Sequence, residues 1–266
     1  MALKRSGDPS FARWGGPPAC TELLRLELGW GPDVSIISHA CVSAHLGLLE
    51  ATRVVEAGLA DEALILSFDF LSPFVAGGFN ALKILNSSFP SPFMERPAGA
   101  IGLGDGAAFA VLSRNRGDWA IEAQSLFNEM HHFTANRGDG SGFAACLGPV
   151  AASLSGRKVW YKGHGTGTLE AGRLEVSAAA AAFPEAPIVG WKGSLGHTLG
   201  SCGLVELALA IEALRTRRVP GTLVDDGTPM SPHVSTEAFD ASTFDGVVCA
   251  SNAFGGAHAA FLLTSA

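Results

Sequence analysis

The chain has 266 residues, of which 47% are hydrophobic and 16% are charged, and its formal net charge is -7. This length suffices for a large hydrophobic core in one or two domains. The negative charge argues against a nucleic-acid partner, because such a partner requires a basic face.

The five cysteines are odd in number and scattered along the chain, so they indicate neither a disulfide framework nor a local metal motif. This distribution predicts a cytoplasmic protein. No apolar run is long enough to span a membrane, and the N-terminus lacks the apolar core of a signal peptide, so we expect no membrane partner. The cysteines are Cys20, Cys41, Cys146, Cys202 and Cys249.

The first 33 residues are rich in Gly, Pro and charge, with one helical segment predicted around 21–27. Residues 34–37 (VSII) predict a strand, Cys41 follows, and a helical pattern then runs to Gly58. A cysteine at the start of a helix faces unpaired N–H groups and the positive end of the helix dipole, which favour a nucleophilic thiolate. On this stretch alone, a small buried core residue is the more usual role.

The remaining pattern alternates strands with helices and therefore predicts an α/β fold. A polar loop is predicted at 127–142 and an irregular excursion at 71–100, because prolines punctuate the latter. The predicted strands are 62–68 (buried), 107–112, 119–124, 158–161, 188–190, 246–250 and 259–264, and the predicted helices run to about 154, over 170–182 and over 199–214.

Two motifs combine histidine with small residues. HGTGT spans His164 to Thr168 between a predicted strand and helix, where small residues let a ligand approach the backbone. By itself this motif favours an ordinary turn with a surface histidine. GWKGSLGHTLGSCG places Lys192 and His197 in an apolar, glycine-rich loop, where such groups are costly unless used or paired. Solvent exposure is the alternative, and Glu206 is the obvious partner for Lys192.

SNAFGG, from Ser251, could present the Phe254 amide to a ligand, although by itself the stretch favours a plain turn between two strands. GLGDG at 102–106 mimics part of a dinucleotide loop, but a strand-like run follows it rather than a helix. Cys41, His164 and His197 lack the usual local spacing of zinc ligands, so we expect no metal, although ligands distant in sequence could still meet.

Taken together and in order, these segments resemble the β-ketoacyl synthases, which are decarboxylating condensing enzymes of fatty-acid and polyketide assembly. The resemblance covers roughly residues 20–266. AC-x-S around Cys41 is similar to the nucleophile motif, HGTGT to the first histidine motif, K-x-x-x-GHT-x-G to the lysine and second histidine, and NAFGG to the terminal glycine-rich turn.

The resemblance implies a thiolase-like layered α-β-α-β-α fold and a role for each motif residue. Cys41 would take the acyl chain from an acyl carrier protein, and the two histidines would promote loss of carbon dioxide from the malonyl thioester. The Cys41 and Phe254 amides would form an oxyanion hole, with Phe254 also gating access. No cofactor is implied beyond the phosphopantetheine of the carrier protein. The resemblance also implies that Thr166 and Thr168 contact that arm. Lys192 would belong to the catalytic set and, paired with Glu206, would order the site, whereas Glu206 and Glu175 would give structural support.

The chain also departs from the family pattern. Only 40 residues precede Cys41, which implies a truncated N-terminal half (1–113) beside a C-terminal half (114–266). The exposed edge would then need a partner subunit, a rearranged N-terminus or upstream residues to cover it. Smaller departures are Ala171-Gly172 after HGTGT, Ala253 for glycine and His258 for asparagine.

Two functions follow from this resemblance. The first is an active condensing enzyme that works as a dimer. The second is a non-catalytic partner, similar to chain-length factors, paired with a full-length ketosynthase. The intact Cys41 favours the enzyme, because chain-length factors usually lack that nucleophile. An acyltransferase that uses Cys41 without decarboxylation is a third, weaker alternative.

Overall fold

The computed structural model describes residues 17–31, 33–85, 89–99, 101–115 and 117–266. The chain divides into two compact units, the first ending at Ser38 and the second beginning at His39. In the first unit, the predicted helix forms as α2 (Pro17–Glu27). The predicted strand at 34–37 is wrong: residues 33–38 form no strand, and Val34 and Ile36 are 37% and 46% exposed. A strand needs a neighbour for its backbone hydrogen bonds, and no described residue supplies one here.

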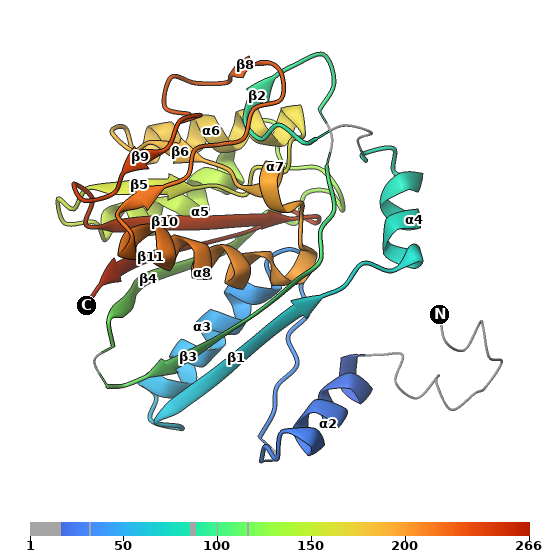
Figure 1. The fold of residues 1–266 in the computed structure, drawn as a ribbon, viewed down its shortest axis with the longest axis vertical. Helices are drawn as coiled ribbons and strands as arrows, with labels where there is room; N and C mark the ends of the chain where they lie inside the picture. The colour runs from blue at the N-terminus through green and yellow to red at the C-terminus, as the bar shows by residue number, and fades with distance from the viewer. Residues whose placement is uncertain (1–16, 32, 86–88, 100, 116) are drawn as a thin grey trace. The chain divides into compact units, whose positions relative to one another are not determined.

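The second unit is built on a five-stranded mixed sheet in the order β4-β11-β10-β5-β6 (Figure 1). The central strands β10 and β11 are joined by a tight turn and pair antiparallel, whereas β5 runs parallel to both β10 and β6. Every residue of β5 and β10 is buried, as expected for strands covered on both faces. The strands are β4 (Trp119–Asn128), β5 (Val159–Lys162), β6 (Ile188–Val189), β10 (Gly246–Ala253) and β11 (Ala257–Ser265).

Helices cover both faces of this sheet. On one face, α5 (Ser141–Ala152) and α6 (Leu169–Ala182) pack onto a core that includes Leu147, Val176 and Val248. On the other face, α3 (Ser43–Glu56) and α8 (Cys202–Arg215) pack between the five-stranded sheet and a second, two-stranded sheet. The short helix η2 (Leu199–Ser201) leads into α8. The predicted α/β class is therefore confirmed.

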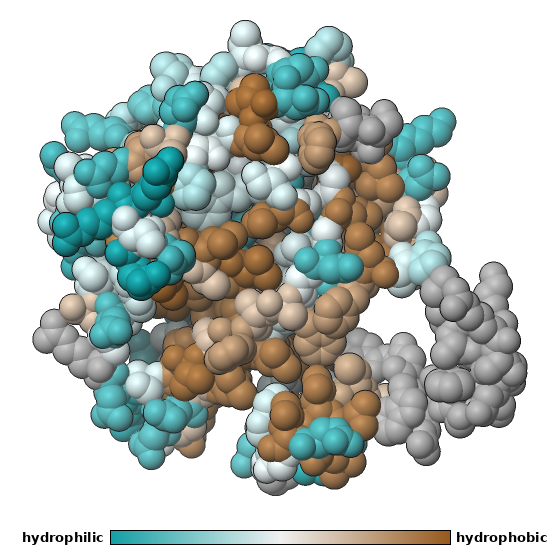
Figure 2. All heavy atoms as spheres, viewed as in Figure 1, coloured by the Kyte–Doolittle hydropathy of each residue, from teal (hydrophilic) through white to brown (hydrophobic). Residues whose placement is uncertain are grey.

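The second sheet pairs β1 (Glu62–Asp69) antiparallel with β3 (Gly106–Ser113). The strand predicted at 62–68 is confirmed, but its predicted burial is wrong, because only Ile65 is buried. The inner face packs on α3 and α8, whereas the outer face carries the cross-strand pairs Leu64–Val111 and Leu66–Phe109, with side chains 38% to 70% exposed. Figure 2 shows hydrophobic surface over these strands.

The predicted irregular stretch at 71–100 contains regular structure, so that prediction is wrong in part. Ser72 caps the N-terminus of helix α4 (Pro73–Ala81): its Oγ accepts the Val75 N–H at 3.2 Å, and Pro73 occupies the first helical turn. Both residues are standard helix-start signals that the apolar, glycine-containing sequence obscured. Strand β2 (Met94–Glu95) pairs with β8 (Thr228–Pro229).

The other predicted elements form with boundaries shifted by a few residues, and β4 extends to Asn128, into the predicted loop. The predicted division between 113 and 114 falls between β3 and β4 and stays a prediction. Among the described residues, no helix is both long and apolar enough to cross a membrane. All five cysteines are free. Short elements that the pattern did not predict include α7 (Lys192–Leu195), β7 (Arg218–Val219) and β9 (Phe239–Asp240).

Candidate active site

Cys41 lies in a tight turn immediately before α3. Backbone hydrogen bonds from Val42 to His39 and from Ser43 to Ala40, both 3.2 Å, form this turn, and Ala40 has a positive φ of 46°. Such a φ is uncommon outside glycine, so the turn holds its backbone in a constrained conformation. The predicted position of Cys41 at the start of a helix is confirmed, and its side chain is only 8% exposed.

His164 follows β5, and the buried carboxylate of Glu175 on α6 holds the segment in place. Glu175 accepts the backbone N–H groups of His164 and Gly165 and the hydroxyl of Tyr161. Burial raises the pKa of Glu175, and the two backbone donors oppose that rise. The predicted supporting position of Glu175 therefore has a direct structural basis. In the same motif, the Thr166 and Thr168 hydroxyls lie 3.2 Å apart.

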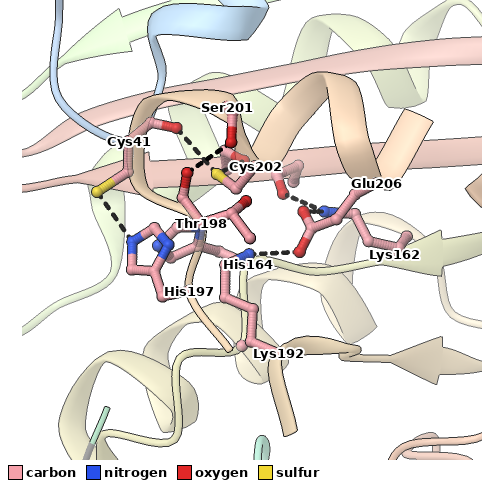
Figure 3. Close-up of polar contacts among 12 residues, drawn as sticks. Cys41, Lys162, His164, Lys192, His197, Thr198, Ser201, Cys202 and Glu206 are labelled. Carbon is pink, nitrogen blue, oxygen red and sulfur yellow. Dashed lines mark hydrogen bonds and ion pairs between the residues drawn. The ribbon is translucent and has the colours of Figure 1, made fainter. Parts of the chain in front are cut away.

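His197 brings the second motif against the first (Figure 3). Its Nε2 lies 3.0 Å from Cys41 Sγ, and its ring meets that of His164 edge to face with the centroids 5.0 Å apart. The Leu199 N–H donates to His197 Nδ1 at 3.2 Å. Because Nδ1 is therefore the acceptor, the proton of the neutral ring is on Nε2, which points a hydrogen-bond donor toward Cys41.

The same three residues offer ligand atoms that all lie within 4.8 Å of one another, so residues distant in sequence do meet here. A metal would need the Nε2 lone pair of His197. That pair becomes available only if the proton moves to Nδ1, where it would face the Leu199 N–H. The hydrogen bond at Nδ1 thus suits His197 to donate a hydrogen bond from Nε2 better than to bind a metal there. The expectation of no metal stays a prediction.

Burial sets the protonation of the cluster. It lowers the pKa of His164 and His197 well below the ordinary value, and the nearby Lys192 charge lowers both further. Both imidazoles are therefore neutral at physiological pH. Burial also raises the pKa of Cys41 to about 12. The thiolate expected from the helix start is thus not favoured in the free site, since the desolvation cost exceeds the favourable effect of the turn.

The predicted partnership of Lys192 with Glu206 is confirmed, with Nζ to Oε1 at 2.6 Å. Although burial opposes its charge, the Glu206 carboxylate raises the pKa of Lys192 above the ordinary value. Sequence reasoning missed Lys162, which binds the other oxygen of Glu206 and donates to the Ala250 carbonyl at 3.1 Å. The available signal was a lysine at the end of the otherwise apolar strand sequence VWYK.

The turn between β10 and β11 borders the nucleophile. Ala253 and Ala257, at its two ends, pack in one cluster with Cys41. Phe254, within the turn, is 38% exposed and stacks on Phe79 of α4 with the ring centroids 6.0 Å apart. The predicted turn and its position beside Cys41 are confirmed, whereas the predicted gating and oxyanion roles of Phe254 stay predictions.

Behind this turn, His258 has a buried partner. Its Nε2 lies 2.8 Å from Glu129 Oε1, and the Glu129 N–H donates to the Gly256 carbonyl at 2.9 Å. His258, which departs from the expected asparagine, is therefore held in place beside the turn rather than exposed.

Comparison with known proteins places this geometry in context. Residues 121–224 match the family model described as beta-ketoacyl synthase, C-terminal domain. The chain is 30% identical over 216 residues to the chloroplastic 3-oxoacyl-[acyl-carrier-protein] synthase II of Arabidopsis thaliana, covering 73% of this chain and 40% of that protein. It is 26% identical to a putative polyketide beta-ketoacyl synthase 1 of Streptomyces halstedii, covering 98% of this chain and 67% of the relative.

Solved structures show the same fold. A ketosynthase in complex with its chain length factor from Xenorhabdus doucetiae matches with a TM-score of 0.85 and 24% identity, covering 92% of this chain and 63% of that one. The ishigamide ketosynthase/chain length factor matches with a TM-score of 0.85 and 21% identity, covering 99% and 70%. The chain thus spans about 40% to 67% of the length of the two curated relatives above.

Proposed function

The chain belongs to the β-ketoacyl synthase family and has its thiolase-like fold, and from this premise we propose that it condenses an acyl thioester with malonyl-[acyl carrier protein] by decarboxylative Claisen chemistry. Fatty-acid or polyketide synthesis would be the setting. The observation that carries this proposal is the meeting of Cys41, His164 and His197, from three distant segments, in one buried cluster with both imidazoles neutral.

In the first half-reaction, Cys41 Sγ would attack the carbonyl carbon of the acyl thioester. A new S–C bond forms, the carrier's S–C bond breaks, and the proton of Cys41 leaves with the carrier thiol. The negative charge that develops on the carbonyl oxygen would be stabilised by the backbone amides of Cys41 and Phe254. Packing of Ala253 in the same cluster as Cys41 supports this pairing of the two segments.

In the second half-reaction, His164 and His197 would donate hydrogen bonds to the malonyl thioester carbonyl. The C–C bond to the carboxylate breaks and carbon dioxide leaves. The electron pair of that bond stays on the thioester side and forms an enolate that the two donors stabilise. The enolate carbon then attacks the acyl carbonyl, a new C–C bond forms, and the C–S bond to Cys41 breaks. The Cys41 sulfur leaves as a thiolate and takes a proton from solvent, which restores the thiol. The Nε2 proton of His197, assigned from the bond that Leu199 donates to Nδ1, suits this donor role. No carboxylate base is needed, because decarboxylation itself generates the nucleophile.

We propose that the substrates arrive on the phosphopantetheine arm of an acyl carrier protein, which Thr166 and Thr168 would contact. The buried pair of Lys192 and Glu206 would hold the neighbouring residues of the site in place. We further propose a dimeric assembly, formed with a second copy or with a full-length ketosynthase. The exposed apolar outer face of β1 and β3 supports such a partner, because contiguous exposed apolar surface commonly marks an interaction site.

A non-catalytic partner role, like that of a chain-length factor, is the second candidate. The same exposed sheet face favours it, since a subunit of that kind would bury this face against a ketosynthase. The nucleophile cluster favours the enzyme instead, because a structural subunit has no use for a thiol in contact with a neutral, proton-donating imidazole.

Intact-mass measurement after incubation with an acyl-carrier thioester separates the two functions. The wild-type chain should gain one acyl group and Cys41→Ala should gain none. The control Cys146→Ala, which changes a buried residue of α5 away from the cluster, should gain the group like wild type. Malonyl carrier protein should then remove the acyl group as a condensed product. A folded chain that gains no acyl group, either alone or with a ketosynthase, would contradict the enzyme and favour the structural partner.

A further inference from the structure

Lys162 is a second fully buried lysine on the carboxylate that holds Lys192 (Figure 3). It ends β5, two residues before His164, and all four residues of that strand are buried. Its Nζ binds Glu206 Oε2, while Lys192 Nζ binds Oε1. Glu206 therefore lies between two ammonium groups, each held to a different oxygen, so its orientation is fixed from both sides.

The charges of this triad do not cancel. Lys162 and Lys192 contribute two positive charges and Glu206 contributes one negative charge, and the Ala250 carbonyl that also accepts from Lys162 carries no net charge. Burying an ion without a full counter-charge costs folding free energy, so an unbalanced charge next to a reactive cluster indicates a function. A single lysine would suffice to pair with Glu206.

We propose that Lys162 is a positioning residue of the active site, which fixes Glu206 against Lys192 and adds a positive charge that opposes protonation of His164 and His197. The donor role of the two imidazoles in this inference comes from the proposed function. The test of Lys162, however, needs no measurement of enzyme turnover.

The electrostatics of the cluster agree with this proposal. Burial is the largest cause of the lowered pKa of both imidazoles, and the charges of Lys192 and Lys162 add to it. His45 and the opposite imidazole further lower the pKa of His164. The negative charge of Asp69 contributes to the raised pKa of Cys41. The other titratable groups packed around the cluster are Cys41, Cys202, Glu175 and Glu206.

Loss of the neutral form would disturb more than charge. A second proton on His197 would go to Nδ1, which already accepts the Leu199 N–H, so that hydrogen bond would be lost and the ring freed. A nearby positive charge opposes this protonation. Lys162 would therefore protect both the protonation state and the orientation of the donor that faces Cys41.

Replacement of Lys162 by methionine tests the proposal. Imidazole signals of the full chain, assigned with His164→Gln and His197→Gln, are followed by NMR from pH 8 to pH 4 without substrate. We expect the titration midpoints of His164 and His197 to rise by about one to two pH units in Lys162→Met. Lys158→Met is the matched control, because Lys158 is an exposed lysine immediately before the same strand. In this variant the midpoints of the two histidines should equal those of wild type.

Lys162→Arg separates charge from packing and serves if the methionine variant does not fold. It keeps the positive charge, so its midpoints should stay near those of wild type. Unchanged midpoints in Lys162→Met, or raised midpoints in Lys162→Arg, would overturn the proposal. In the condensation assay, the acidic limb of the pH profile should move upward with the midpoints. Raised midpoints in a chain that never forms an acyl adduct would refute the proposed function while leaving the role of Lys162 intact.

Discussion

The Leu199 N–H donates to His197 Nδ1 at 3.2 Å, and this one bond determines which ring nitrogen carries the proton. The opposite nitrogen, Nε2, lies 3.0 Å from Cys41 Sγ. A backbone group just before α8 thus prepares a donor at the nucleophile, although the two side chains are 156 positions apart in the sequence.

The donor role of His197 predicts different effects for two substitutions. His197→Ala removes the donor and should lower the condensation rate by about 10²- to 10³-fold, whereas His197→Gln can place an amide N–H near the former Nε2 and should lose less. Rapid-mixing measurement of acylation and condensation as separate steps checks this. Acylation of Cys41 should change little in both variants. Equal condensation rates in the alanine and glutamine variants would contradict the donor role.

Glu206 should be a strong stability determinant. Glu206→Gln leaves two buried ammonium groups without a counter-charge, and breaking a buried ion pair in this way costs about 3–5 kcal/mol of unfolding free energy. Urea unfolding followed by circular dichroism measures the loss. Glu212→Gln is the matched control on the same helix, because Glu212 is exposed and its pair with Arg215 is solvated. An unfolding midpoint for Glu206→Gln equal to that of the control would refute the buried triad.

His45 should make stability depend on pH. Burial, and then the Lys162 and Lys192 charges, lower its pKa to about 3. Between that value and the unfolded value of about 6.5, the unfolded state binds more protons, so stability falls as the pH decreases, by up to about 1.4 kcal/mol per pH unit. His45→Leu should lose the part of this slope that His45 contributes, whereas the buried His164 and His197 keep their parts. We would compare unfolding free energies at pH 7.5 and 5, where a smaller pH effect in the leucine variant supports the assignment and an equal one opposes it.

The stacking of Phe79 on Phe254 predicts a control on access to Cys41. Phe79→Ala should free the ring of Phe254 and increase alkylation of Cys41 by iodoacetamide several-fold, since the thiol is 8% exposed in the closed site. Phe74→Ala, on the same helix but 89% exposed, is the control. If both variants react at the wild-type rate, Phe254 does not gate the site.

The sequence predicted much of the site because its chemistry lies in local motifs. Cys41 before a helix, His164 after a strand, and the pairing of Lys192 with Glu206 could all be inferred from residue type and spacing. Lys162 could not, because its partners come from β10 and α8 and no local pattern joins these elements. The neutral thiol was also missed, since desolvation depends on the whole packed environment rather than on the helix start.

The fold was predictable where burial gave a clear period and less so elsewhere. Residues 34–37 have strand propensity but pair with no strand in the described part of the chain. Strand β1 has an apolar sequence although one of its faces is exposed. Both errors share a cause, because apolar character predicts burial only when a covering element exists. Helix α4 was missed for the opposite reason: Ser72 caps a short segment whose composition shows little amphipathic contrast.

The outer face of β1 and β3 gives the last prediction. Phe109 is 70% exposed and lies opposite Leu66, which is 38% exposed, so this face should form the contact with a second copy or a ketosynthase. Phe109→Ser combined with Leu66→Ser should abolish that association while changing the stability of the single chain by less than about 1 kcal/mol. Sedimentation velocity, alone and with a ketosynthase, measures the assembly. Met130→Ser is the control, because Met130 is 87% exposed beyond β4. A double variant that still associates like this control would show that the partner binds elsewhere.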